Sequence, residues 1–213
     1  MKKAMILMTF ITFLLGIILL VSYINADASQ TTIANKLIRF HVIANSDIPE
    51  DQALKLKVKD EVLAYIYPKL KDSKSLEESR KILEENTGVI KEIAKKVIKE
   101  KGYNYSVDAT LSHENFPVKS YGNITLPEGN YEAYRVIIGS GEGKNWWCVM
   151  FPPLCFTDIT RGEVAYKETE NEMKKVLNEK EYEIVNNNLE SKSSENKLIF
   201  KFKILETIKK FIK

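Results

Sequence analysis

The alternation of side chains between residues 36 and 44 predicts a β-strand. Successive side chains fall on opposite faces of an extended chain, which gives two sets of residues: Leu37, Arg39 and His41, and Ile38, Phe40 and Val42. Period-two spacing with β-branched and aromatic side chains is typical of strands. Residues 103–111 alternate in the same way and predict another strand, which is buried on one face.

Apolar residues at helical spacing predict two helices between these strands. The first begins after Ser46 or Asp47, because either side chain would cap the free N–H groups and Pro49 suits the first turn. We expect this helix to end at about residue 67, just before a proline. The second helix covers residues 76–101 and has an apolar stripe along its length.

The second half of the chain contains short apolar runs that predict further strands. A short extended piece is expected over residues 116–126 and a strand over residues 131–138. A glycine-rich loop at residues 139–145 follows, and residues 146–151 are expected to return as the hairpin partner. This order of elements predicts an α+β fold: a two-layer sandwich of a mixed, mainly antiparallel sheet with two helices on one face.

The N-terminal residues have the pattern of an export signal or a membrane anchor. Lys2 and Lys3 precede an uncharged apolar run over residues 4–25, which is long enough for a membrane span of about 20 residues. Ala26–Ala28 has the small-x-small form of a cleavage site. Residues 1–28 are therefore either a cleaved signal peptide or a retained hydrophobic anchor helix in the membrane. Both alternatives place the rest of the chain outside the cytoplasm.

Composition divides the remainder of the chain into three parts. Residues 33–160 contain the predicted α+β domain. Residues 161–196 are mostly polar and predict a helix followed by a linker. Residues 197–213 contain six lysines and one glutamate and form a basic amphipathic tail. Such a tail either lies on an anionic membrane surface or docks on the domain as an edge strand and a short helix.

The composition argues against several kinds of site. The net charge of the chain is only +3, so no strong field for nucleic acid is expected. The two histidines and two cysteines do not have the close spacing of metal ligands. The loop at residues 139–145 lacks the first glycine and the Ser or Thr of a phosphate-binding loop. We therefore expect no catalytic residues, metal, cofactor, nucleic acid or small-molecule substrate.

The densest apolar segment of the chain runs from Trp146 to Phe156. It contains both tryptophans, both cysteines and two prolines, and no charge interrupts it. Aromatic side chains bring a large apolar area either to a core or to a binding surface. In an exported protein, Cys148 and Cys155 would form a disulfide if the chain turns at the intervening prolines; two buried thiols are the alternative.

Two long motifs in the chain resemble those of the stage II sporulation protein R family. The first motif runs from Leu37 to Asp47 and continues through Pro49–Lys55, and the second is Asn145–Phe156. Shorter matches follow the order of the family between them, including Leu126–Ala133. The resemblance covers about residues 36–158. Both motifs are long and unusual, which makes the resemblance specific.

The resemblance implies a signalling role and no catalytic activity. Members of the family are made in the forespore of endospore-forming bacteria and are exported into the space between the two septal membranes. There they are required to activate a membrane-embedded aspartic protease of the mother cell, which removes the pro-sequence of sigma factor E. This chain is therefore expected to be secreted or N-terminally anchored in that space, with the protease as its partner.

Six residues form the candidate contact surface for such a partner. They lie at the expected strand-to-helix corner and in the aromatic segment: His41, Asn45, Ser46, Asp47, Trp146 and Trp147. Aromatic side chains are enriched at the centres of protein interfaces. Helix capping is the alternative role for the polar residues, and core packing is the alternative for the tryptophans. Two other functions stay open: an exported cell-wall hydrolase and a septal structural protein.

Overall fold

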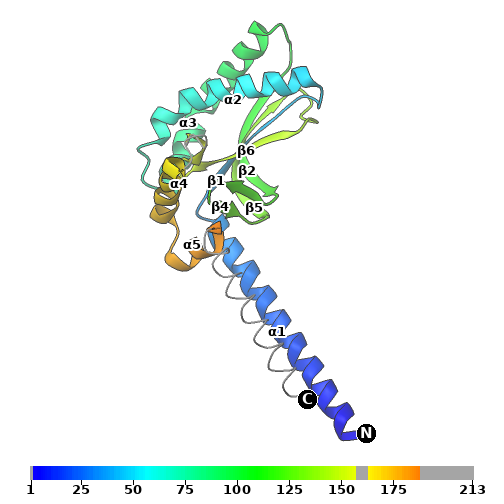
Figure 1. The fold of residues 1–213 in the computed structure, drawn as a ribbon. Coiled ribbons are helices and arrows are strands. Elements are labelled where there is room, and N and C mark those ends of the chain that lie inside the picture. The colour runs from blue at the N-terminus through cyan, green and yellow to red at the C-terminus, as the bar shows by residue number, and fades with distance from the viewer. Residues whose placement is uncertain (1, 157–162, 188–213) are drawn as a thin grey trace.

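The computed structural model describes residues 2–156 and 163–187. Its helices are α1 (Lys2–Ala34), α2 (Pro49–Leu70), α3 (Leu76–Glu100), α4 (Glu163–Val176) and α5 (Glu179–Val185), with the 3-10 turn η1 (Leu154–Phe156). Its strands are β1 (Ile38–Ile43), β2 (Val107–Phe116), β3 (Lys119–Tyr121), β4 (Ile124–Leu126), β5 (Gly129–Ile138) and β6 (Asn145–Phe151). Figure 1 shows α1 projecting away from the rest of the fold.

The helix α1 contains the residues that were expected to form a signal peptide or an anchor. Its C-terminal end belongs to the folded domain, since Ile33 and Ala34 are buried. Across the described residues, no helix has both the length and the apolar character needed to cross a membrane. The signal peptide or anchor at residues 1–28 stays a prediction.

The strand β1 lies inside the four-stranded sheet, between β5 and β6. It pairs in parallel with β5 and antiparallel with β6, and β5 pairs antiparallel with β2. The sheet is therefore mixed, as predicted, but the hairpin expected between β5 and β6 is wrong. The loop that joins them crosses the end of β1 instead. Its Gly143 N–H donates to the Ala44 carbonyl at 2.9 Å, and Gly143 lies so close to the Ser46 backbone that a side chain there would clash.

The helices α2 and α3 cover one face of this sheet and form the first core with it. The buried members from β1 are Ile38, Phe40 and Val42. The buried apolar members from the two helices include Leu54, Val58, Val62, Ile66, Leu83, Ile90 and Ala94. Full burial of a large apolar side chain contributes about 1.5–3 kcal/mol to folding. The space between this face and the two helices therefore contains the main hydrophobic core of an α+β fold.

Both ends of α2 differ from the prediction. The N-cap residue is Ile48, which makes no side-chain capping bond, although Pro49 occupies the first turn as expected. At the other end the helix continues through Pro68 to Leu70. Leu70 is buried in the first core. A proline in the last turn removes one backbone hydrogen bond, and the packing of Leu70 holds the helix together beyond it.

A second core lies on the other face of the sheet. It collects apolar residues from α1, β4, β6, α4, α5 and the segments that follow α1 and α4: Ile33, Leu37, Ile124, Leu126, Val149, Met173, Leu177, Tyr182 and Val185. The helices α4 and α5 fall in the segment predicted as a polar helix and linker, and they pack on the domain. The linker residues from 188 to 196 and the basic tail at 197–213 lie outside the described residues.

Candidate functional site

Four side chains form a row across the sheet on the face opposite α2 and α3. The strand register places Arg135 of β5 opposite both Thr110 of β2 and His41 of β1. His41 in turn lies opposite Trp147 of β6. These four residues are named the Trp147 row. Thr110, Arg135 and Trp147 are only half-buried, so this row is accessible on the face.

His41 is at the centre of the row and has only 4% of its surface exposed. Its ring stacks on Trp147, with centroids 5.0 Å apart, and lies 5.3 Å from the ring of Phe116. The side-chain nitrogen of Asn145 is 3.2 Å from Nδ1, whereas Nε2 has no hydrogen-bond partner among the described residues. Burial, followed by the charge of Arg135, lowers the pKa of His41 to about 4, so the ring is neutral at pH 7.

Trp147 gives the row a half-exposed aromatic surface. The Phe116 ring contacts it at a centroid distance of 4.8 Å in an edge-on arrangement. Nζ of Lys119 lies 5.7 Å from the centre of the Trp147 ring, within the range at which a cation is attracted to an aromatic face. Beside them, Arg135 forms an ion pair with Glu114. Aromatic groups mixed with arginine are enriched at protein interfaces.

Arg39 lies next to this surface and is fully buried. Its guanidinium carbon is 4.3 Å from the centre of the Phe116 ring and 4.8 Å from that of Tyr131. Nη2 donates to the Tyr121 hydroxyl at 3.0 Å, but Nε and Nη1 have no hydrogen-bond partner among the described residues. Because Phe116 in turn contacts two members of the Trp147 row, Arg39 supports the row through Phe116.

Sequence reasoning did not identify Arg39 as part of the site. Arginine side chains are mostly exposed, and a full burial without a carboxylate partner is unusual. One signal was available, since the alternation of β1 places Arg39 on the same face as Leu37 and His41, in a stretch with apolar residues on both faces. A strand of that composition belongs in the middle of a sheet, where both faces are buried.

Trp146 points to the opposite side of the sheet from Trp147. Its ring packs edge-on against Phe40 of the first core, with centroids 5.9 Å apart. Nζ of Lys59 lies 4.9 Å from the centre of the same ring. The two tryptophans therefore belong to different faces, and the single contact surface expected from the sequence is divided between them.

Asn45, Ser46 and Asp47 connect the strand-to-helix corner to the loop after β5. The side chains of Asn45 and Ser46 donate to the buried carboxylate of Asp51 at 2.9 and 2.7 Å. Burial opposes ionisation of Asp51, but these hydrogen bonds outweigh it and lower the pKa of Asp51. The Asp47 carboxylate accepts the backbone N–H of Lys144 at 2.7 Å. The three residues thus have structural partners, although they do not cap α2 as expected.

Cys148 and Cys155 are joined in a disulfide, with Cα atoms 5.4 Å apart. This is the first of the two alternatives that the sequence left open. The bridge links β6 to η1 and encloses the turn at Pro152–Pro153. In the chain-entropy model a loop this short contributes about 2–3 kcal/mol. The bridge therefore fixes the strand that carries Trp147.

The arrangement defines a class of protein: an α+β domain with one sheet face buried under helices and a row of aromatic and cationic side chains on the other. A family model described as Stage II sporulation protein R matches residues 34–161. The chain is 38% identical over 202 residues to Stage II sporulation protein R of Bacillus subtilis (strain 168), covering 92% of this chain and 90% of that protein. The chain therefore belongs to the stage II sporulation protein R family, which supports a role in sporulation. No solved structure matches it.

Proposed function

We propose that this protein is an exported sporulation signal that activates a membrane-embedded aspartic protease of the mother cell, which then processes pro-sigma E. Membership of the stage II sporulation protein R family is the observation that carries the proposal. In this proposal the chain is not itself an enzyme and acts by binding. Residues 1–28 direct its export from the forespore into the intermembrane septal space and are then either cleaved or retained as an anchor.

The protease docks on the Trp147 row in this account. Trp147 offers a half-exposed indole, which the rings of His41 and Phe116 hold in one orientation. The ion pair of Arg135 and Glu114 provides polar groups on the same face. A side chain that is already fixed loses little conformational entropy on binding. The Trp147 indole, once a partner covers it, is therefore an effective anchor.

Activation by binding requires the protein to distinguish two states of the protease. A ligand shifts an equilibrium only by the amount by which it favours one state. A shift from 1:99 to 99:1 needs about 10⁴-fold tighter binding to the active state. A dimeric arrangement of the protease that this chain favours is one state of that kind.

A heterologous host tests the proposal. The host makes the membrane protease and pro-sigma E, with or without the full chain carrying its own N-terminal segment. Immunoblotting measures the ratio of processed to unprocessed sigma factor. The proposal predicts processing only when the chain is present. Equal processing in both hosts would remove the proposal, and turnover of purified peptidoglycan would then test the hydrolase alternative.

A further inference from the structure

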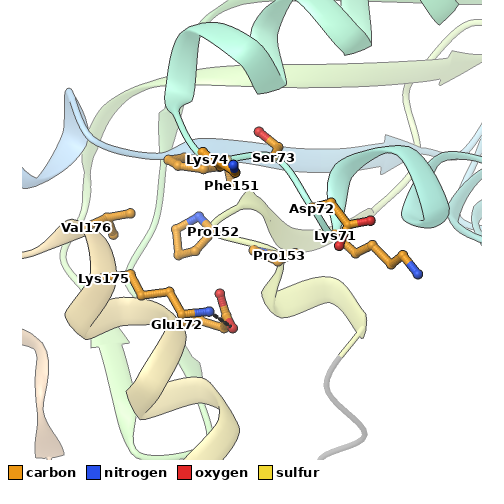
Figure 2. A pocket seen from close by; sticks show the side chains of 10 residues that line it. All are labelled: Lys71, Asp72, Ser73, Lys74, Phe151, Pro152, Pro153, Glu172, Lys175 and Val176. Atoms are coloured by element: carbon orange, nitrogen blue, oxygen red, sulfur yellow. Dashed lines mark hydrogen bonds and ion pairs between the residues drawn. The ribbon is translucent and has the colours of Figure 1, made fainter.

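A pocket of about 350 Å³ lies apart from the Trp147 row, where three segments of the chain meet. The segments are the turn after α2, the Pro152–Pro153 turn after β6, and the C-terminal half of α4. Figure 2 shows the side chains that line it. Sites for small ligands have volumes of about 300–1,000 Å³. The pocket is therefore large enough to bind a short piece of a peptide.

The floor of this pocket is apolar and is held in place. Phe151 and Pro152 are buried, and Val176 packs against both cores. The N–H of Leu154 donates to the carbonyl of Pro152 at 2.8 Å, and the disulfide closes the same turn. A floor that is ordered before binding reduces the entropy that binding would otherwise lose. This part of the pocket suits an apolar side chain.

The rim of the pocket has three ammonium groups, from Lys71, Lys74 and Lys175, and two carboxylates, from Asp72 and Glu172. Glu172 pairs with Lys175 at 2.6 Å, whereas no ion pair joins Lys71 or Lys74 to a carboxylate within the described residues. Figure 2 shows Lys74 on one side of Pro152 and the ion pair of Lys175 with Glu172 on the other. An anionic group placed over Pro152 would therefore meet the ammonium group of Lys74 on one side and an existing ion pair on the other.

Stability of α2 explains only part of this arrangement. Cations just after a helix C-terminus interact favourably with the helix dipole, by about 0.3–1 kcal/mol each. That role accounts for Lys71, the C-cap residue of α2, but not for Lys74, which directly precedes Ser75, the N-cap of α3. It does not account for an apolar hollow beneath them or for a lysine that reaches the same hollow from α4. The combination of apolar floor and cationic rim points to a ligand.

We infer that this pocket binds an acidic peptide segment in which a carboxylate stands beside an apolar side chain. The apolar side chain occupies the floor formed by Phe151, Pro152 and Val176, and the carboxylate is bound at the rim by Lys74. Charge complementarity selects this occupant, because the rim has three ammonium groups and two carboxylates, and no ion pair within the described residues involves Lys74. The inference adds a second docking point to the proposed function and rests on it only for the identity of the partner.

Calorimetric titration of the full chain tests the chemistry of the ligand. The probe is a capped peptide of alternating glutamate and leucine, and its matched control has glutamine in place of glutamate. We expect the glutamate peptide to bind about fivefold more tightly than the glutamine peptide, with a difference that shrinks at high salt. Equal affinity for the two peptides would overturn the inference.

A pair of substitutions tests the location. Lys71→Gln with Lys74→Gln should raise the Kd of the glutamate peptide about fivefold. Lys81→Gln with Lys96→Gln removes the same charge from well exposed positions on α3 that do not line the pocket, and should change the Kd by less than about twofold. An equal loss in both double variants would mean that general charge, and not the pocket, binds the peptide.

Vesicles and the processing assay separate the remaining outcomes. One outcome is that phosphatidylglycerol vesicles bind through Lys71 and Lys74 while the glutamate peptide does not bind at all. The ligand would then be a lipid surface and not a peptide, and the inference would be overturned. A wild-type chain that triggers processing but binds no acidic peptide removes only this inference. A chain that binds the peptide in the pocket yet triggers no processing contradicts only the proposed function.

Discussion

The two faces of the sheet are made by the same strands but differ in what they bury. Toward α2 and α3, β1 contributes Ile38, Phe40 and Val42, which are apolar and fully buried. Toward the other side it contributes Arg39 and His41, which are buried with nitrogen atoms that lack partners among the described residues. Burial of such groups opposes folding. The first face therefore stabilises the fold. The second face contains Arg39 and His41, whose burial is not explained by a gain in stability.

The largest effect is expected from Phe40→Ala on the helix-covered face. Phe40 is fully buried and contacts the rings of Tyr134 and Trp146. Truncation of a buried phenylalanine costs about 3–5 kcal/mol, which urea denaturation measures as a lower free energy of unfolding. Phe40→Leu keeps most of the apolar volume and should cost less than about 2 kcal/mol. A loss below about 1 kcal/mol for Phe40→Ala would contradict the claim that the helix-covered face stabilises the fold.

His41 should make the free energy of unfolding fall as the pH decreases from about 6.5 to about 4. Its pKa is about 4 in the folded chain and about 6.5 in the unfolded chain. Between these values the unfolded chain binds the proton first, so acid favours unfolding. The difference between the two pKa values corresponds to about 3 kcal/mol at pH 4.

His41→Phe isolates this effect, because it keeps a flat ring but does not titrate. Urea denaturation at pH 7 and at pH 4.5 should show a smaller loss of stability in the variant than in the wild type. Asp51 also has a lowered pKa, so it loses stabilising ionisation as the pH falls through that pKa, but it does so in both proteins. The same pH dependence in both proteins would show that His41 is not buried in its neutral form.

Asn45→Ala should cost about 1–2 kcal/mol. The substitution removes a donor to Asp51 and an acceptor for the Ser140 N–H. Thermal unfolding measures the loss, and Ser140→Ala, which removes a hydroxyl that donates to the Asn45 carbonyl at 2.7 Å and to Asn45 Oδ1 at 3.4 Å, should lose less. Processing of pro-sigma E should be unchanged at equal amounts of folded protein. Lower processing under that condition would return Asn45 to the contact surface.

Arg39→Met should have the smallest effect on stability. The free energy of unfolding should stay within about 1 kcal/mol of wild type or rise, because a buried charge without a paired carboxylate gives way to an apolar side chain of similar length. Near-ultraviolet circular dichroism should change, since Phe116 loses the group that packs on it. Arg39→Lys is the control that keeps the charge. A loss above about 3 kcal/mol in Arg39→Met would make Arg39 a structural residue and weaken the contrast between the faces.

Local patterns predicted the order of the elements but not the pairing of the strands. The alternation in β1 and the apolar stripes of α2 and α3 depend on neighbouring residues, which the sequence displays directly. The glycine-rich loop after β5 has the composition of a hairpin turn. Its course depends on contacts such as Gly143 with Ala44, nearly 100 residues away in the chain, and no local pattern reports them.

The site shows the same limit. His41 and Trp147 were identified from the sequence, and the separation of Trp146 from Trp147 follows from the alternation of side chains along a strand. Thr110 and Arg135 were not identified, because they join the row only through the register of β2 and β5 with β1. Long-range register is a property of the folded sheet.

Processing of pro-sigma E by variants at the two tryptophans tests the central claim most directly. Trp147→Ser and Trp146→Ser are compared in the heterologous host at equal amounts of folded full-length protein. Loss of an aromatic anchor costs about 2 kcal/mol or more in binding, so Trp147→Ser should lower processing at least about tenfold, while Trp146→Ser should stay within about twofold of wild type. Equal losses for the two variants, or a larger loss for Trp146→Ser, would contradict the claim that the partner docks on the Trp147 row.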